Sequence, residues 1–160
     1  MTTLQLGAGM RPMQGAVNHD RTQHHEWVDV AHNLDLLPWP FADAAYDRVV
    51  ALDVMEHLKV DVADWLAECW RILAPGGMLI LRLPAWDAPT SYRDVTHRRV
   101  FQEESFLLFD PRSRLWKDYG NFYFGADYRA WWHIESVERV NADPRYGVGD
   151  LGFVLKKVTE

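Results

Sequence analysis

The stretch that decides the fold is LQLGAGMRPMQGAVNHD, residues 4–20. A short apolar strand runs into a Gly-x-Gly turn, and a second short strand ends in an acid. Gly7 and Gly9 let the backbone turn sharply and approach a ligand closely, because they carry no side chain. Asp20, at the end of the second strand, can accept hydrogen bonds from the two hydroxyls of a ribose. The stretch is typical of a nucleotide-binding βαβ unit, although no helical pattern lies between its strands.

A loop can replace the missing helix. Residues 10–16 reach at most about 25 Å when extended, and a return along a strand of three or four residues needs about 13 Å plus the lateral step. The same holds for residues 21–26 after the second strand. Residues 4–6 and 28–30 alternate apolar and polar, which predicts one buried and one solvated face. We therefore expect two helices to be reduced to loops on one side of the sheet.

The rest of the chain continues an α/β pattern. RVVALDV (48–54) and MLILRLP (78–84) are nearly continuous apolar runs, which predict central strands covered on both faces. Between them, apolar residues recur at helical spacing from Val62 to Leu73, after Asp61 as a cap and before APGG as a stop. Residues 133–140 and 151–158, joined through the turn-rich NADPRYGVGD, predict an antiparallel strand pair.

Composition indicates one ordinary globular domain. The 160 residues are 48% hydrophobic and 25% charged, and no apolar run approaches the length of a membrane span. The single cysteine, Cys69, cannot form an internal disulfide, so we expect a cytoplasmic protein. The net charge of −6 argues against broad attraction to nucleic acid.

Four segments together resemble the successive motifs of class I S-adenosylmethionine-dependent methyltransferases: LQLGAG, GAVNHD, VAHNLDLLPWPFADAAYDRVVALDVMEHL and WRILAPGGMLILRLP. The resemblance is to a compact branch whose first helices are reduced to loops. It covers residues 4–84, with a weaker echo in DVTHRRVFQEESF (94–106). It implies a Rossmann-like fold with a mostly parallel sheet, one domain over 1–160, and a substrate-side insertion at 85–132. It also implies methyl transfer from S-adenosylmethionine to an acceptor that it does not identify; the aromatic residues and the net negative charge favour a small-molecule acceptor.

The resemblance implies a set of cofactor-binding residues at the strand ends. The methionyl part would contact Gly7, Ala8 and Gly9 in the glycine turn and Asp53 after the fourth strand. The ribose would contact Asp20 after the second strand, and the adenine would contact Asn33 and Leu34 after the third strand. Gln5 departs from the pattern, since many members have an acid there that helps bind the ammonium group. Asn33 replaces a frequent aspartate, although an amide oxygen can also accept the adenine amine.

Two histidines are candidate bases. Methyl transfer is a displacement at an activated sulfonium, so a base is needed only when the acceptor must lose its proton. His57, in the EHL segment, is one candidate, and its alternative role is in capping or packing. His97 is the second, with Asp94 as an orienting partner, and its alternative is a solvated surface loop.

The group His24, His25 and Glu26, with His19, suggests a metal site only superficially. Its spacing fits no established ligand pattern, and an adjacent histidine pair rarely coordinates one ion. We expect no metal site in the chain.

The segment WKDYGNFYFGADYRAWW (116–132) holds eight aromatic residues in seventeen. Three interpretations stay open: an acceptor-binding wall, a cover for the sheet face that the reduced helices leave bare, and a dimer interface.

Two other functions compete with methyl transfer to a sugar or small metabolite. One is a non-catalytic domain that keeps the fold for binding or assembly. The other is a nicotinamide-dependent reductase, which needs a helix N-terminus for its pyrophosphate. Pro12 and the lack of helical periodicity in GAGMRPMQG disfavour the reductase.

Overall fold

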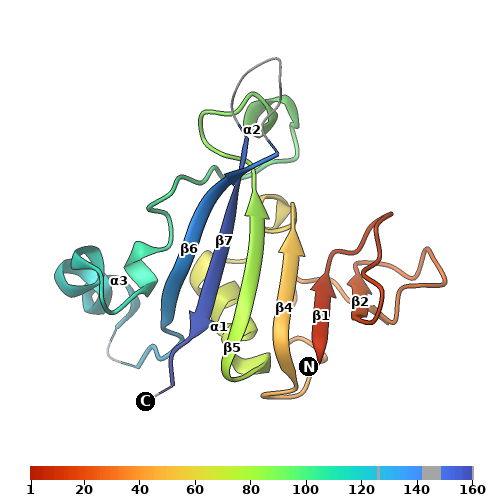
Figure 1. The fold of residues 1–160 in the computed structure, drawn as a ribbon, viewed down its shortest axis with the longest axis horizontal. Coiled ribbons are helices and arrows are strands. Elements are labelled where there is room, and N and C mark those ends of the chain that lie inside the picture. The colour runs from red at the N-terminus through yellow and green to blue at the C-terminus, as the bar shows by residue number, and fades with distance from the viewer. Residues whose placement is uncertain (126, 142–148, 160) are drawn as a thin grey trace.

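The structure is a computed structural model that describes residues 1–125, 127–141 and 149–159. Seven strands form one sheet in the order β3-β2-β1-β4-β5-β7-β6 (Figure 1). They are β1 (Thr3–Leu6), β2 (Val17–Asp20), β3 (Val30–Ala31), β4 (Tyr46–Leu52), β5 (Leu73–Leu83), β6 (Trp132–Val140) and β7 (Asp150–Lys157). The first five run parallel, and β7 is antiparallel to both β5 and β6. The predicted fold class is confirmed. Most of the predicted connection between β6 and β7 lies outside the described residues.

One long helix, α1 (Val62–Ile72), connects β4 to β5 and packs Trp65 and Leu66 into the core. Asp61 is the N-cap residue, as predicted, although its side chain makes no capping hydrogen bond. Strand β5 begins at Leu73 and not at Met78, because the segment after the helix is already extended and Leu73 pairs with Tyr46. The remaining helical turns are short: η1 (Met55–His57), α2 (Thr90–Arg93), η2 (Leu107–Phe109), η3 (Trp116–Gly120) and α3 (Asn121–Phe124).

The connection from β1 to β2 is a loop without any helix, as expected. Two buried amide side chains hold it. The Gln5 amide donates to the carbonyl of Arg11 (3.0 Å), and the Met13 N–H donates to the amide oxygens of Gln5 (2.6 Å) and Asn18 (2.9 Å). The Gln5 side chain therefore secures the loop that stands in for the helix.

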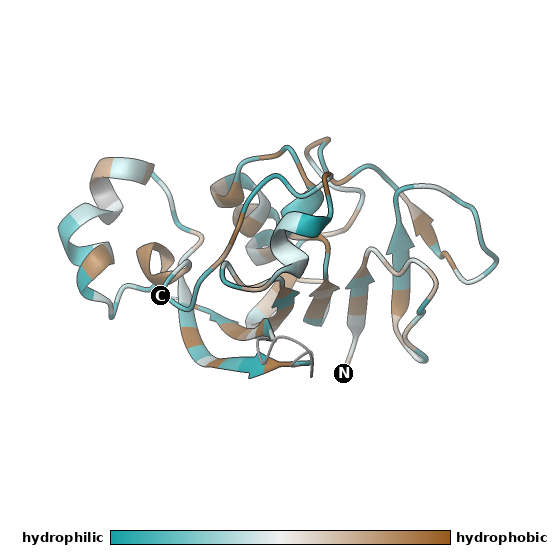
Figure 2. Ribbon diagram, turned by 90° about the horizontal axis from the view of Figure 1, so that it is seen from above, coloured by the Kyte–Doolittle hydropathy of each residue, from teal (hydrophilic) through white to brown (hydrophobic). Residues whose placement is uncertain are grey.

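Among the residues that the structure describes, helices cover the sheet on one side only, as Figure 2 shows. On β5, Leu79, Leu81 and Leu83 are buried against that side, while Ile80 and Arg82 between them are half-buried. The prediction that the central strands are covered on both faces therefore holds for Val49–Ala51 of β4, which are all buried, but is wrong for β5. The physical reason is the loss of the helices after β1 and β2, which leaves β5 with a face that only neighbouring strands and side chains screen.

The aromatic segment packs beside α1 and the edge strand β6, away from the bare face. The Tyr128 hydroxyl donates to the carbonyl of Ala63 in α1 (3.1 Å). Phe124 stacks on Phe109 with ring centroids 4.7 Å apart, and Trp132 is fully buried. The interpretation that these rings cover the bare face is thus wrong; they extend the core on the helical side.

The insertion after β5 divides into two parts. Its first part, with α2, lies at the carboxyl ends of β4 and β5, and Ala85 forms a bridge with Phe101 (Figure 1). Its second part, with η3 and α3, returns beside β6. None of the described helices is both long and apolar enough to cross a bilayer.

Candidate active site

The glycine turn and Asp20 form one hydrogen-bonded unit at the ends of β1 and β2. The Gly9 N–H donates to one Asp20 carboxylate oxygen (2.6 Å), and the Arg21 N–H donates to the other (2.6 Å). Gly7 has φ +63°, and a Cβ there would lie 2.6 Å from a methyl group of Val54. The turn therefore requires glycine both for its backbone conformation and for the space beside η1.

His19 supports this turn from within the sheet. Its Nε2 lies 2.9 Å from the carbonyl oxygen of His32, so Nε2 carries the proton and Nδ1 accepts from the Gly7 N–H (3.4 Å). Burial lowers the pKa of His19, which keeps the ring neutral. Sequence reasoning missed this role, because it considered His19 only as a metal ligand.

A pocket of about 290 Å³ opens beside the turn. Five of the seven predicted cofactor-binding residues line it: Gly7, Asp20, Asn33, Leu34 and Asp53. Ala8 is buried beneath the turn, and Gly9 faces the Asp20 carboxylate. The structure thus brings the carboxyl ends of β1, β2, β3 and β4 around one cavity.

Asp53 lies between this pocket and a larger one. It follows β4 with φ +58°, a left-handed conformation that is uncommon for a residue other than glycine and is found at functional sites. Its carboxylate forms a two-pronged ion pair with the guanidinium of Arg82 in β5. This pair fixes the direction of the Asp53 side chain and raises the pKa of Arg82.

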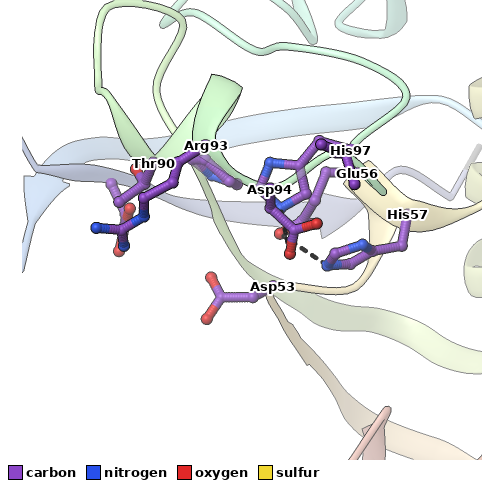
Figure 3. A pocket seen from close by; sticks show the side chains of 10 residues that line it. Asp53, Glu56, His57, Thr90, Arg93, Asp94 and His97 are labelled. Atoms are coloured by element: carbon purple, nitrogen blue, oxygen red, sulfur yellow. Dashed lines mark ion pairs between the residues drawn. The ribbon is translucent and has the colours of Figure 1, made fainter.

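The larger pocket has a volume of about 560 Å³, and all three predicted catalytic residues line it (Figure 3). The rings of His57 and His97 have centroids 4.7 Å apart, and Asp94 Oδ2 lies 3.8 Å from His97 Nε2. Its lining residues are Asp53, Glu56, His57, Pro84, Thr90, Arg93, Asp94, Val95, His97 and Asp150. Two segments that are 40 residues apart in the chain therefore meet here.

The hydrogen bonds of the two histidines fix their tautomers. Thr96 Oγ1 donates to Asp94 (2.7 Å), because a carboxylate only accepts, so it must accept from His57 Nδ1 (2.9 Å). His97 Nδ1 donates to the carbonyl of Ser91 (3.1 Å). Both rings thus keep the lone pair of Nε2 free. Asp94 orients His57 through Thr96, a link that the sequence did not indicate.

Electrostatics keep His57 neutral. Burial and the neighbouring His97 lower the pKa of His57. Hydrogen bonds from Thr96 lower the pKa of Asp94 and keep it charged. The pocket thus presents the neutral imidazole of His57 beside the charged carboxylate of Asp94.

Glu56 is the residue of this site that sequence reasoning missed. Its side chain is fully buried, and neither carboxylate oxygen has a hydrogen-bond partner in the described part of the chain. Burial raises its pKa to about 8. The available signal was its position directly after an apolar strand, next to His57.

The loop at 94–101 is held against η1 and the residues that follow it by hydrogen bonds to main-chain carbonyls. The Arg98 N–H donates to the carbonyl of Glu56 (2.8 Å), and the Arg99 guanidinium donates to the carbonyls of Leu58 (2.8 Å) and Val60 (3.0 Å). The separation of His97 from η1 is therefore set by hydrogen bonds and does not depend on the histidines.

Residues 7–81 match a protein family described as a methyltransferase domain. This match spans the glycine turn, Asp20, Asp53 and η1, and it includes strands β2, β3 and β4 and most of β5. The matched region is similar to methyltransferase domains and covers a little under half of the 160 residues. S-adenosylmethionine is the cofactor of this family, as the resemblance implies.

A probable S-adenosylmethionine-dependent methyltransferase of Mycolicibacterium smegmatis is similar to this chain, with 42% identity over 72 residues. The matched region is 44% of this chain and 26% of the relative, so the match spans about a quarter of that protein.

Two solved methyltransferases have the same fold. A Thermotoga maritima enzyme has a TM-score of 0.66 at 15% identity, over 99% of this chain and 82% of that one. A Burkholderia thailandensis N1-methyltransferase, solved with 1,6-didemethyltoxoflavin and S-adenosylhomocysteine, has a TM-score of 0.62 at 20% identity, over 99% and 71%. At these identities the likeness concerns the fold.

Proposed function

We propose that the protein transfers a methyl group from S-adenosylmethionine to a small polar acceptor, with the donor in the smaller pocket and the acceptor in the larger. The observation that carries this proposal is that Asp53 and His57 line both pockets. A donor in the smaller pocket would present its methyl group where the larger pocket begins. The proposal treats residues 1–160 as one methyltransferase domain.

The donor would be held mainly through its ribose and its amino group. Each Asp20 oxygen accepts one backbone N–H and keeps lone-pair capacity for a ribose hydroxyl. Asn33 and Leu34 would face the adenine. Because the Gln5 side chain is bound to the loop, we assign the ammonium group to Asp53, an acid that lines the pocket together with Gly7.

In the reaction, an acceptor lone pair forms a bond to the methyl carbon while the carbon–sulfur bond breaks and neutral S-adenosylhomocysteine leaves. When the acceptor is a hydroxyl, its proton must also depart. The free Nε2 atoms of His57 and His97 can take this proton. Asp94 assists by fixing the ring of His57 through Thr96.

The acceptor pocket favours a polar compound. Thr90, Arg93, Asp94 and Asp150 line it, and none of the eight aromatic residues at 116–132 does. Hydroxyl and amino groups of a sugar or a small polar metabolite match such a lining. We favour O-methylation, with N-methylation as the next choice. The net charge of −6 does not suit a nucleic-acid backbone.

Two finer expectations belong to the same proposal. The first is a cytoplasmic location, which the single, free and buried Cys69 favours. The second is a homodimer that covers the bare face of β5, where Ile80 is half-buried. Light scattering measures the mass in solution, and a monomer at all concentrations would contradict the dimer.

Calorimetric titration tests the proposal. We expect S-adenosylmethionine and S-adenosylhomocysteine to bind at one site per chain, and NADH not to bind. Asp20→Ala should abolish binding, while Asp118→Ala, at an exposed surface ion pair, serves as the matched control and should bind normally. If neither adenosyl compound binds the unaltered protein, the proposal is wrong.

A further inference from the structure

Glu56, His57 and His97 each offer one ligand atom, and these atoms lie within 4.8 Å of one another. Within residues 1–125, 127–141 and 149–159, they are the only histidine, cysteine or acidic residues that gather in this way. We propose that this triad binds one divalent transition-metal ion. Two imidazoles and one carboxylate are donors that such ions accept, and zinc sites with open positions use this set.

The histidines are already arranged as metal ligands. In metal sites, a ligating histidine usually donates its other ring N–H to a carbonyl or to a group held by a carboxylate. His97 donates from Nδ1 to the Ser91 carbonyl, and His57 donates to Thr96, which in turn is bound to Asp94. Both Nε2 lone pairs are therefore available for an ion.

The environment of the Glu56 carboxylate supports the metal site independently of the histidines. A buried carboxylate without hydrogen bonds is unfavourable, because burial removes its hydration and nothing replaces it. Its side chain is 0% exposed, both oxygens lack a partner in the described residues, and Oε1 lies 4.0 Å from His57 Nε2. An ion between these groups would supply the missing partner.

The triad needs only a small contraction. Ligand bonds of about 2.0–2.1 Å in a tetrahedral site place the ligand atoms roughly 3.3 Å apart. No separation therefore has to shrink by more than about 1.5 Å, which side-chain rotation can supply. The backbone does not have to move, since the Arg98 N–H already ties the His97 loop to the Glu56 carbonyl.

The surrounding charge suits a cation. Asp53 and Asp94 line the same pocket, against Arg93 (Figure 3). Asp150 also lines this pocket, while Arg82 pairs with Asp53. Three protein ligands leave at least one coordination position open toward this pocket.

Resting on the proposed function, this position would take an oxygen of the acceptor. The ion would lower the pKa of a bound hydroxyl, so that its proton leaves to water and the oxygen attacks the methyl carbon. His57 and His97 would then hold the ion and would not accept the proton. The acceptor would accordingly be a hydroxyl compound.

The test is a titration of the chelator-treated full chain with Co²⁺, followed by visible absorption, and then with Zn²⁺ in competition. We expect one ion per chain. Glu56→Gln and His97→Gln should each abolish binding, and Thr96→Val, which only removes the partner of His57, should weaken it about 10- to 100-fold. The matched control is His24→Gln/His25→Gln, which removes two histidines beside an acid elsewhere and should bind normally.

Thermal unfolding of each variant shows whether it is folded, and Glu56→Gln, which keeps the side-chain shape, should fold. Absence of a Co²⁺ band in the unaltered protein overturns the inference, as does binding that persists in both folded ligand variants or disappears in the control. Calorimetry with S-adenosylhomocysteine on the same samples separates the two proposals. If the unaltered protein binds S-adenosylhomocysteine but no Co²⁺, only the metal site is refuted; if it binds Co²⁺ but no adenosyl compound, only the donor site is refuted.

Discussion

Two parts of the molecule place histidines beside an acid, and they behave in opposite ways. His24, His25 and Glu26 are neighbours in the chain, yet the ring of His25 stacks on Trp27 with centroids 4.2 Å apart and that of His24 bonds to Thr22. Glu56, His57 and His97 come from two distant segments, yet their polar atoms converge on one pocket. The difference shows that strand ends and the loops tied to them gather functional groups more effectively than adjacency in the sequence.

The largest expected effect is on the reaction rate. With an acceptor found by screening small hydroxyl and amino compounds with labelled S-adenosylmethionine, His57→Gln/His97→Gln should lower the rate by about 10²- to 10⁴-fold, because the acceptor loses the groups that handle its proton. His24→Gln/His25→Gln should leave the rate unchanged. Equal losses in the two double variants would remove the distinction between the two regions.

A smaller effect is expected from the threonine that supports each region. Thr96 Oγ1 lies 2.9 Å from His57 Nδ1, and Thr22 Oγ1 lies 2.7 Å from His24 Nδ1. Thr96→Val should lower the rate about 10-fold or more, since an outer partner orients a functional histidine. Thr22→Val should have no effect. A rate measurement on this matched pair decides whether Thr96 is a positioning residue or only part of a surface turn.

The third expected effect concerns stability and pH. Burial lowers the pKa of His19 below 6.5 in the folded protein, whereas the unfolded chain takes up a proton near 6.5. Below pH 6.5 the unfolded state therefore binds more protons than the folded state. The free energy of unfolding consequently decreases as the pH is lowered, until the pKa of His19 in the folded protein is reached. Denaturant unfolding at several pH values measures this slope. His19→Gln should flatten it, and His24→Gln should leave it as it is; a slope that persists in His19→Gln would contradict this origin.

Much of the fold could be predicted from the sequence, because its signals are local. The apolar runs at 48–54 and 78–84 indicate two strands, and helical spacing indicates α1 between them. Whether helices cover one or both faces of a strand could not be predicted in the same way. It depends on which helices are present elsewhere in the chain, so Ile80 and Arg82 are half-buried despite an apolar pattern.

The candidate site divides along the same line. The glycine turn was predictable because its backbone conformation requires glycine. Asp20 was predictable because an acid at this strand end can bind the hydroxyls of a ribose. Glu56 was not, since its burial follows from the docking of the 94–101 loop on η1. His57 and His97 could each be nominated alone, but their 4.7 Å ring separation depends on a long insertion without a recognisable pattern.

The central claim is that donor and acceptor sites are separate pockets that meet at Asp53 and His57. The most direct measurement is calorimetric titration of S-adenosylhomocysteine into three proteins: the unaltered chain, Asp20→Ala and His57→Gln/His97→Gln. We predict binding to the first, none to the second, and binding within about 10-fold of the first in the third, because the histidines act on the acceptor and contribute at most about 1.4 kcal/mol to donor binding. Binding that survives in Asp20→Ala but is lost in the double histidine variant would contradict the account.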